Sequence, residues 1–215
     1  MCTSYKTGRD INYHDLFDVD PPAGEWREEV YKDYPAPIVL RVPEGARAAR
    51  LATFGLVPRK HIPEGVKVFD TMNCRMETVA MKRSFSGAWR GGQLCLIPCN
   101  SFYEPNYESG KAVRWRISMA DGKPFAIAGL WRAWNEPEGQ ALSFTMLTLN
   151  ADQHTLMSRF HKPGSEKRSV VIMPPAHYED WLECRDPEVA RTFLRLTQPE
   201  EMRAEADPLP PRAPR

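Results

Sequence analysis

Cysteine is scarce in this sequence, and long apolar runs are missing. Five of the 215 residues are cysteine, an odd number that does not suit a framework of paired disulfides. The N-terminus has no apolar run that could serve as a secretory signal, and no stretch approaches the roughly 18 apolar residues of a membrane-spanning helix. We therefore expect a cytoplasmic protein with reduced thiols and no membrane association. The cysteines are Cys2, Cys74, Cys95, Cys99 and Cys184.

Metal-ligand clusters and a dominant charge are missing too. Cys95 and Cys99 are separated by three residues, but no matching pair of cysteines or histidines follows at the spacing of a zinc site. Lysine and arginine together number 29, and aspartate and glutamate number 28, which gives a net charge of +1. This balance gives no support for a strongly basic surface, so any binding of nucleic acid has to use a local patch. We expect no metal site.

The residues that are present favour a globular α+β protein. Hydrophobic residues make up 42% of the chain and aromatic residues 10%, enough for a large core. Three β-prone runs between residues 112 and 151 are separated by turn sequences, a pattern typical of an antiparallel meander with one buried face. We predict a single domain, residues 2–198, with a largely antiparallel, barrel-like β core and flanking helices. Residues 199–215 are rich in proline and charge, and we expect a disordered tail there.

Apolar periodicity and turn residues also predict the separate elements. Residues 3–35 are polar and are expected to be irregular. The predicted strands cover residues 35–42, 49–58, 91–105, 112–120, 124–134, 142–151 and 167–175, and the predicted helices cover residues 76–85, 152–163, 175–184 and 187–196.

Cys2 follows the initiator methionine, and this position gives it unusual chemistry. A small second residue generally lets the methionine be removed, after which Cys2 carries a free α-amine beside its thiol. The amine has an unperturbed pKa of about 7.7–8.0 and the thiol one of about 8.5, so both become nucleophilic near neutral pH. With an aldehyde the pair can form an imine and then a thiazolidine ring. The alternatives are hydrolysis by the thiol, or no function at all, and position alone favours the last.

Polar residues beside apolar runs are the other candidates. Glu104 follows the apolar run CLIPCNSFY and suits a general acid, although a strand end that faces water is the simpler interpretation. His161 ends a predicted helix, where it could carry a proton or only interact with the helix dipole. Asn73 could orient an amine or a sugar oxygen, and Arg75 could bind a phosphate through two nitrogens. Turn chemistry and a solvated helix face are the simpler interpretations of these two residues.

Seven short motifs occur in order along the chain. They are MC at the start, FGLVP (54–58), NCRMETV (73–79), CLIPCNSFYEP (95–105), FAIAGLW (125–131), MLTLNA (146–151), and a histidine at 161 followed by RSVVIM (168–173). Together they resemble the SRAP (SOS response-associated peptidase) family, whose members shield abasic sites in single-stranded DNA. The resemblance runs from Cys2 to about Trp181 and implies the SRAP fold.

The resemblance implies a role for each matching residue. Cys2 would capture the opened sugar aldehyde of an abasic site, and Asn73 would position the Cys2 amine or the opened sugar. Glu104 would protonate the sugar oxygen and move protons as the imine forms, while His161 would assist proton transfer and reversal of the linkage. The residues implied to contact DNA are Arg75, Arg83, Arg168, Phe54 and Thr148.

Three features depart from the family pattern. Ser4 stands where family members have an arginine that binds phosphate. Thr53 and Phe54 replace a pair of tryptophans, and five additional residues separate His161 from Arg168. These changes affect the predicted contacts with DNA more than the chemistry of Cys2.

The predicted function is that of an abasic-site sensor in the DNA damage response. As a monomer without metal or cofactor, it would bind single-stranded DNA and form a thiazolidine crosslink through Cys2, with autoproteolytic removal of the N-terminal residue. One alternative is a peptidase that uses Cys2 on itself or on other proteins. A second is a non-covalent single-stranded nucleic-acid-binding protein that uses interleaved arginines and aromatics, as in residues 114–116. Dependence on DNA and on Cys2 distinguishes the three.

Overall fold

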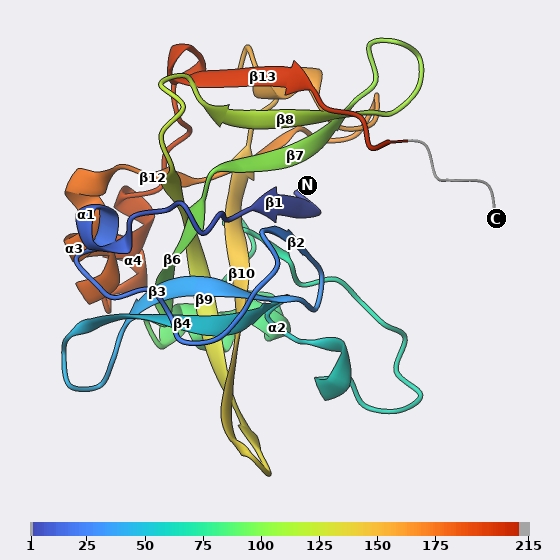
Figure 1. The fold of residues 1–215 in the computed structure, drawn as a ribbon. Helices are drawn as coiled ribbons and strands as arrows, with labels where there is room; N and C mark the ends of the chain where they lie inside the picture. Colours follow the sequence, from blue (N-terminus) through green and yellow to red (C-terminus); the bar gives the residue numbers. More distant parts are fainter. Residues whose placement is uncertain (1, 211–215) are drawn as a thin grey trace.

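The computed structural model describes residues 2–210, and its strands form two sheets (Figure 1). The prediction of an α+β domain with a largely antiparallel, barrel-like β core is confirmed. Most strand pairs run antiparallel, while β10 (Gly139–Asn150) pairs in parallel with β4 (Arg47–Phe54) and with β5 (Asn73–Arg75).

The smaller sheet joins the beginning, the middle and the end of the chain. The short strand β1 lies between β2 and β7, where Ser4 is opposite Tyr31 on one side and Tyr103 on the other. The N-terminal residues are therefore held inside a sheet rather than left free. In order across the sheet, the strands are β13 (Met202–Ala206), β8 (Val113–Met119), β7 (Ser101–Asn106), β1 (Ser4–Lys6) and β2 (Glu29–Tyr31).

The larger sheet contains a long hairpin of β9 (Phe125–Glu136) and β10, which projects downward in Figure 1. The apolar run Leu94–Cys99 forms β6, which is buried along its whole length between β3 and β9. Burial on both faces explains why its sequence is apolar without alternation. The other strands are β3 (Pro35–Arg41), β11 (Arg168–Val170) and β12 (Ile172–Met173).

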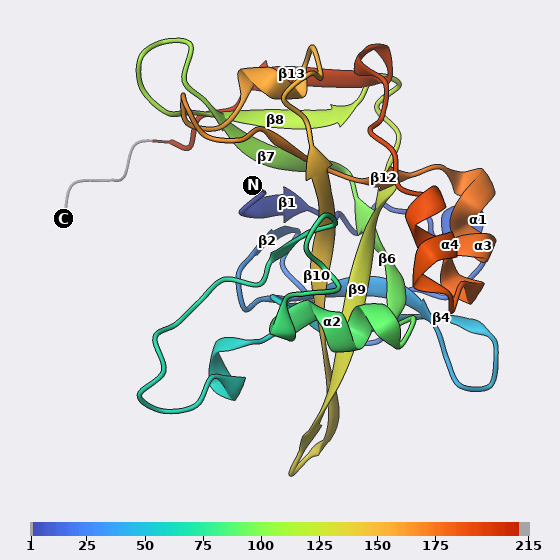
Figure 2. The same cartoon turned by 180° about the vertical axis from the view of Figure 1, so that it is seen from behind.

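The helices are short and cover the outside of the sheets. Three of them gather on one side of the molecule, and α2 (Arg83–Arg90) lies against β9 on another face (Figure 2). Among residues 2–210, no helix has the length and apolar character needed to cross a membrane. The remaining helices are α1 (Tyr13–Phe17), α3 (Tyr178–Glu183) and α4 (Pro187–Thr192), with 3₁₀ turns η1 (Arg59–His61), η2 (Met157–Arg159), η3 (Pro175–His177) and η4 (Pro199–Glu201).

The two ends of the chain are more ordered than the sequence predicts. The segment expected to be irregular at 3–35 contributes β1, α1 and β2. The tail predicted to be disordered at 199–215 contains η4 and the strand β13, which pairs with β8 from Met202 to Ala206. These segments form strands because their backbone groups pair with strands that are distant in the chain, and the local sequence does not predict such pairing. Residues 211–215 of this predicted tail lie outside the described residues.

Two predicted helices are wrong in extent. The helix expected at 76–85 is replaced by turns, and α2 begins only at Arg83. The helix expected at 152–163 is reduced to the single turn η2. The His154 ring accepts hydrogen bonds from the backbone N–H groups of Leu156 and Met157, and this local turn competes with a helix.

Candidate active site around Cys2

The smaller sheet places Cys2 beside Glu104. Strand β1 begins at Ser4 and runs antiparallel to β7, with Ser4 opposite Tyr103, so the two residues before β1 lie next to the part of β7 that follows Tyr103 and includes Glu104. Cys2 is 1% exposed, and its thiol donates to the backbone oxygen of Ser4 at 3.2 Å. Burial, and then the negative charge of Glu104, raise the pKa of the Cys2 thiol far above its ordinary value. The resting thiol is therefore protonated at neutral pH and needs a base before it can react.

Glu104 and His161 form a buried pair. The Glu104 Oε2 atom lies 2.8 Å from the His161 Nε2 atom, and the two side chains are 2% and 7% exposed. The backbone N–H of Arg168 donates to His161 Nδ1 at 3.4 Å, which leaves the Nε2 atom as the one that lies against Glu104. The backbone N–H of His161 donates to the carbonyl of Pro105, which anchors the histidine to the end of β7. The two facing atoms lie within hydrogen-bonding distance in a buried part of the structure.

Asn73 holds the backbone of Cys2 from the opposite side. Strand β5 pairs with β10 from Asn73 to Arg75, and the Asn73 Nδ2 atom donates to the Cys2 carbonyl at 2.7 Å. The Asn73 Oδ1 atom is buried and has no hydrogen-bond partner within residues 2–210. An unpaired buried acceptor is costly, and a free α-amine on Cys2 is a donor that could satisfy it.

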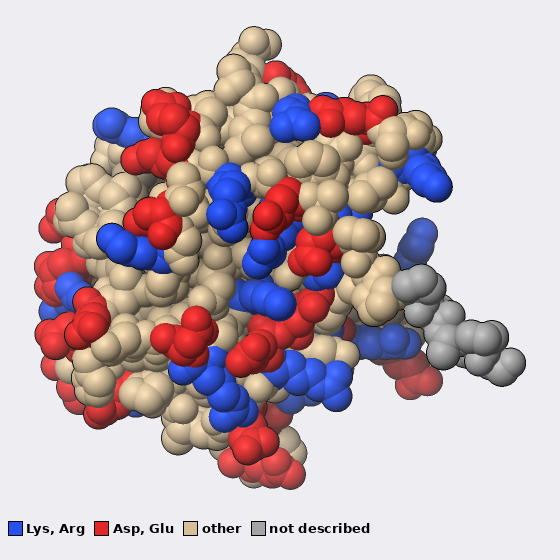
Figure 3. All heavy atoms as spheres, turned by 45° about the horizontal axis from the view of Figure 1, so that its top comes forward, with Lys and Arg blue, Asp and Glu red and all other residues tan. Residues whose placement is uncertain are grey.

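Two of the predicted DNA contacts share a cleft with Asn73. Arg75 and Arg83 are both exposed, and with Lys82 they line a depression of about 280 Å³. The cleft brings three cationic side chains next to the residue that holds Cys2. Figure 3 shows basic and acidic side chains interspersed over one face, as the near-zero net charge predicts, so a local cluster is the relevant feature.

The other three predicted DNA contacts need correction, because they are buried. Phe54 is fully buried and stacks on Phe144, with ring centres 5.1 Å apart. Thr148 is 1% exposed and its hydroxyl donates to the carbonyl of Cys74. Neither side chain has a surface that a DNA strand could touch in this structure.

Arg168 is only 2% exposed, and protein groups occupy its guanidinium. It lies 2.8 Å from Glu77 and 2.7 Å from Glu166, and it donates to the Thr148 carbonyl at 2.7 Å. Its position supports a structural role, in which it ties β11 to β10 and to the segment after β5. Direct contact between Arg168 and phosphate would require these ion pairs to break.

Sequence reasoning missed Glu166, which lies in the additional segment between His161 and Arg168. Its carboxylate bridges Arg168 and the exposed Arg75, whose Nη1 atom is 2.6 Å from Glu166 Oε2. Hydrogen bonds from Arg168 and then from Asn150 lower the pKa of Glu166, so it is an anion at neutral pH. The local sequence around position 166 does not predict this ion pair, because its partner Arg75 is distant in the chain.

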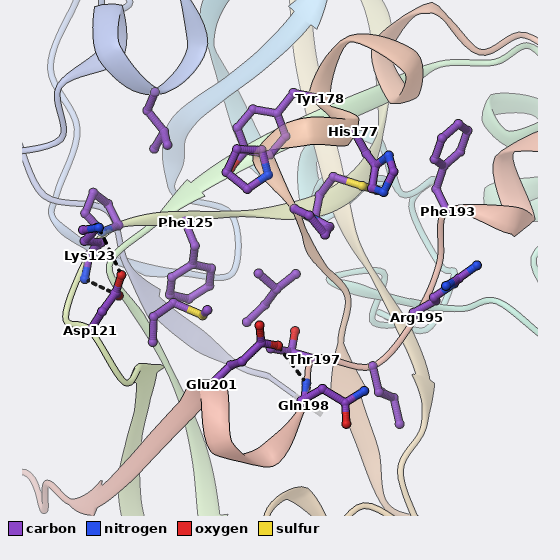
Figure 4. Close-up of a pocket in the computed structure, with 18 of the residues that line it drawn as sticks. Asp121, Lys123, Phe125, His177, Tyr178, Phe193, Arg195, Thr197, Gln198 and Glu201 are labelled. Carbon is purple, nitrogen blue, oxygen red and sulfur yellow. Dashed lines mark hydrogen bonds and ion pairs between the residues drawn. The ribbon is translucent and has the colours of Figure 1, made fainter.

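A larger cavity lies away from these residues. It has a volume of about 810 Å³, and its walls combine apolar side chains, such as Phe125 and Tyr178, with polar ones, such as Thr197 and Gln198 (Figure 4). None of the predicted site residues lines this cavity. Cavity size alone would therefore point to a different region from the predicted site residues. Within residues 2–210, no group of three or more metal-binding side chains is close enough to hold a metal ion.

Comparison with protein families gives one match over nearly the whole chain. The family model described as "SOS response associated peptidase (SRAP)" matches residues 1–209. Among curated proteins, the abasic site processing protein YoqW of Bacillus subtilis is 28% identical over 195 residues, which cover 87% of this chain and 83% of that protein. The abasic site processing protein HMCES of Gallus gallus is 23% identical over 168 residues, covering 69% of this chain and 48% of that protein.

Solved structures agree with the fold. A crystal structure of a protein from Bordetella bronchiseptica is 34% identical, with a TM-score of 0.87, and the match covers 97% of this chain and all of that one. A second, from Bacteroides thetaiotaomicron, is 19% identical with a TM-score of 0.65, covering 86% of this chain and 79% of that one, and it supports the fold alone.

Proposed function

This chain belongs to the SOS response associated peptidase family, and from that premise we propose that it captures abasic sites in DNA as a covalent adduct of Cys2. The single observation that carries the proposal is the arrangement around Cys2. A buried thiol lies beside the Glu104–His161 pair, and the Asn73 amide holds the same residue by its backbone. Relatives with 28% and 23% identity are named abasic site processing proteins, which agrees with this chemistry.

The proposed reaction has two covalent steps once Met1 has been removed. The Cys2 amine attacks the aldehyde carbon of the opened sugar, and the carbonyl oxygen leaves as water to give an imine. The thiol sulfur then adds to the imine carbon, its proton passes to the imine nitrogen, and a thiazolidine ring results. The net change is the loss of one water, with no oxidant or reductant. Glu104 and His161 supply and accept the protons, which is general acid–base catalysis.

The proposed partner is single-stranded DNA, because the nucleophile is deeply buried and an abasic sugar reaches it more easily when a paired strand does not hold it in a duplex. Arg75 and Arg83 would bind the phosphates that flank the lesion. The acting species is proposed to be a monomer, since Cys2, its neighbours and the basic cleft all come from one chain.

The test uses an oligonucleotide with one abasic site and a denaturing gel. The parent protein should give a shifted band, while Cys2→Ala, or an undamaged oligonucleotide, should give none. Intact-mass analysis of the free protein reports whether Met1 is absent. A trimmed, folded protein that produces no shifted band would overturn the proposal.

Two further variants separate this function from a general peptidase. Arg83→Ala should weaken crosslinking at low DNA concentration, because it removes a phosphate contact. Arg90→Ala is the matched control at the other end of α2, where the arginine binds its own helix through the Ser86 carbonyl. Equal effects of the two substitutions would count against a DNA-binding role of the cleft.

A further inference from the structure

His161 has a backbone conformation that side-chain-bearing residues rarely adopt. Its φ angle is +66°, in the left-handed region. A non-glycine residue there carries a steric cost, and it persists only where surrounding contacts hold it. The ring of this residue faces Glu104, so the contacts that hold its backbone also decide where the proton pair sits.

The Lys167 ammonium provides such contacts. It donates to the carbonyl of Phe160 at 2.8 Å, to that of His161 at 3.1 Å and to that of Lys162 at 3.4 Å. An ammonium has three hydrogens, one for each carbonyl, so a single side chain gathers three successive backbone oxygens around the left-handed turn.

The base of Lys167 is itself fixed. Its backbone N–H donates to the Asp152 carboxylate at 2.8 Å, and its carbonyl accepts from the backbone N–H of Ala151 at 2.8 Å. Both partners directly follow the end of β10. The Lys167 side chain therefore connects the turn at His161 to the end of β10.

The neighbouring charged side chains Glu166 and Arg168 have other partners than the His161 carbonyl. Glu166 is occupied by Arg168 and Arg75, and the Arg168 side chain is directed at Glu77 and Glu166. The exposed Lys162 contributes its carbonyl to the turn. Within the 162–167 segment, it is the Lys167 side chain that donates to the His161 carbonyl.

We propose that Lys167 is a positioning residue, which holds the left-handed turn at His161 so that its Nε2 atom stays against Glu104. This inference rests on the proposed function of Cys2, Glu104 and His161. It gives the additional segment between His161 and Arg168 a structural role at the site. Loss of the ammonium should misplace the proton carrier without altering the basic cleft.

The test compares Lys167→Met with Lys162→Met, the same substitution on the exposed lysine of the same segment. Crosslinking is measured in single turnover over a range of abasic-oligonucleotide concentrations. Lys167→Met should lower the maximal rate roughly tenfold or more, because small displacements of a catalytic group are costly, while the half-saturating DNA concentration stays within about twofold. Lys162→Met should behave as the parent, and Lys167→Arg, which keeps a cation with several donors, should recover most of the rate.

A second readout does not depend on DNA. In ¹⁵N-labelled free protein, the His161 ring should show a protonated Nε2 in the parent and in Lys162→Met, and an averaged, solvent-like pattern in Lys167→Met. Unchanged ring signals with an unchanged maximal rate, or a loss that lies wholly in the half-saturating concentration, would overturn the positioning role. If the parent itself forms no crosslink, the proposed function fails, and the ring signals still decide this inference. Should Lys167→Met not fold, Lys167→Gln, a neutral donor, is judged by the same two criteria.

Discussion

Replacing Glu104 with glutamine should change two properties of the site in opposite directions. Glutamine has nearly the same shape and keeps a polar group near His161 Nε2, which lies 2.8 Å from the Glu104 carboxylate, but it cannot take up a proton. Glu104 is 2% exposed, so no water can easily substitute for it. Crosslinking should therefore slow by about a hundredfold, within the usual contribution of a general acid–base group.

The same substitution should make the Cys2 thiol more reactive toward a small reagent. Burial is the larger cause of the raised pKa of Cys2, and the charge of Glu104 is the second. Glutamine removes only the second cause, so the pKa falls modestly and alkylation by iodoacetamide should rise by less than about tenfold. A slower crosslink together with a faster alkylation separates proton transfer from simple access to the thiol.

The assay follows both reactions in the same preparation. Crosslinking is timed on a denaturing gel with saturating abasic oligonucleotide, and alkylation of Cys2 is followed by peptide mass. Glu138→Gln, in the exposed turn of the β9–β10 hairpin, is the matched control and should alter neither rate. If both rates fall together, the site has collapsed, and if crosslinking is unchanged, Glu104 is not the proton carrier.

Two further predictions concern the ion pairs around Arg168. Glu77→Ala should lower the free energy of unfolding, measured in urea, by about 2 kcal/mol. This loss is smaller than the usual cost of breaking a buried ion pair, because Glu77 is half exposed and Glu166 still pairs with Arg168. A loss below about 0.5 kcal/mol would contradict this account. Glu166→Gln should free Arg75 for phosphate, and the salt dependence of binding to undamaged single strands should steepen by about 0.7 in log–log slope. The double variant with Arg75→Gln should lose this gain, and a slope unchanged in Glu166→Gln would contradict the competition.

Several elements could be predicted from the sequence because their signals are local. The strands β3, β8 and β9 follow from apolar runs bounded by turn residues, and the structure places them within a few residues of their predicted limits. Local signals failed where long-range pairing decides. Residues 202–206 have weak strand propensity, yet they pair with β8.

The predicted site residues divide in the same way. Cys2, Asn73, Glu104 and His161 were chosen for their chemistry and motif positions, and the structure brings them together from four separate segments. Phe54, Thr148 and Arg168 were chosen for DNA contact, but they are buried. A single sequence does not report burial for residues that alternate between the two faces of a strand until the register is known.

The amino-acid sequence determines which side chains are available: a thiol at position 2, a carboxylate at 104, an imidazole at 161 and a near-balanced set of charges. Their burial, pKa and orientation follow from the way the chain folds. Pairing of β1 between β2 and β7 buries Cys2 and raises the pKa of its thiol, and the return of the chain after β10 sets His161 against Glu104. The reason is physical, because pKa and orientation depend on burial and on neighbours that are distant in the chain, as Glu104 is from both Cys2 and His161.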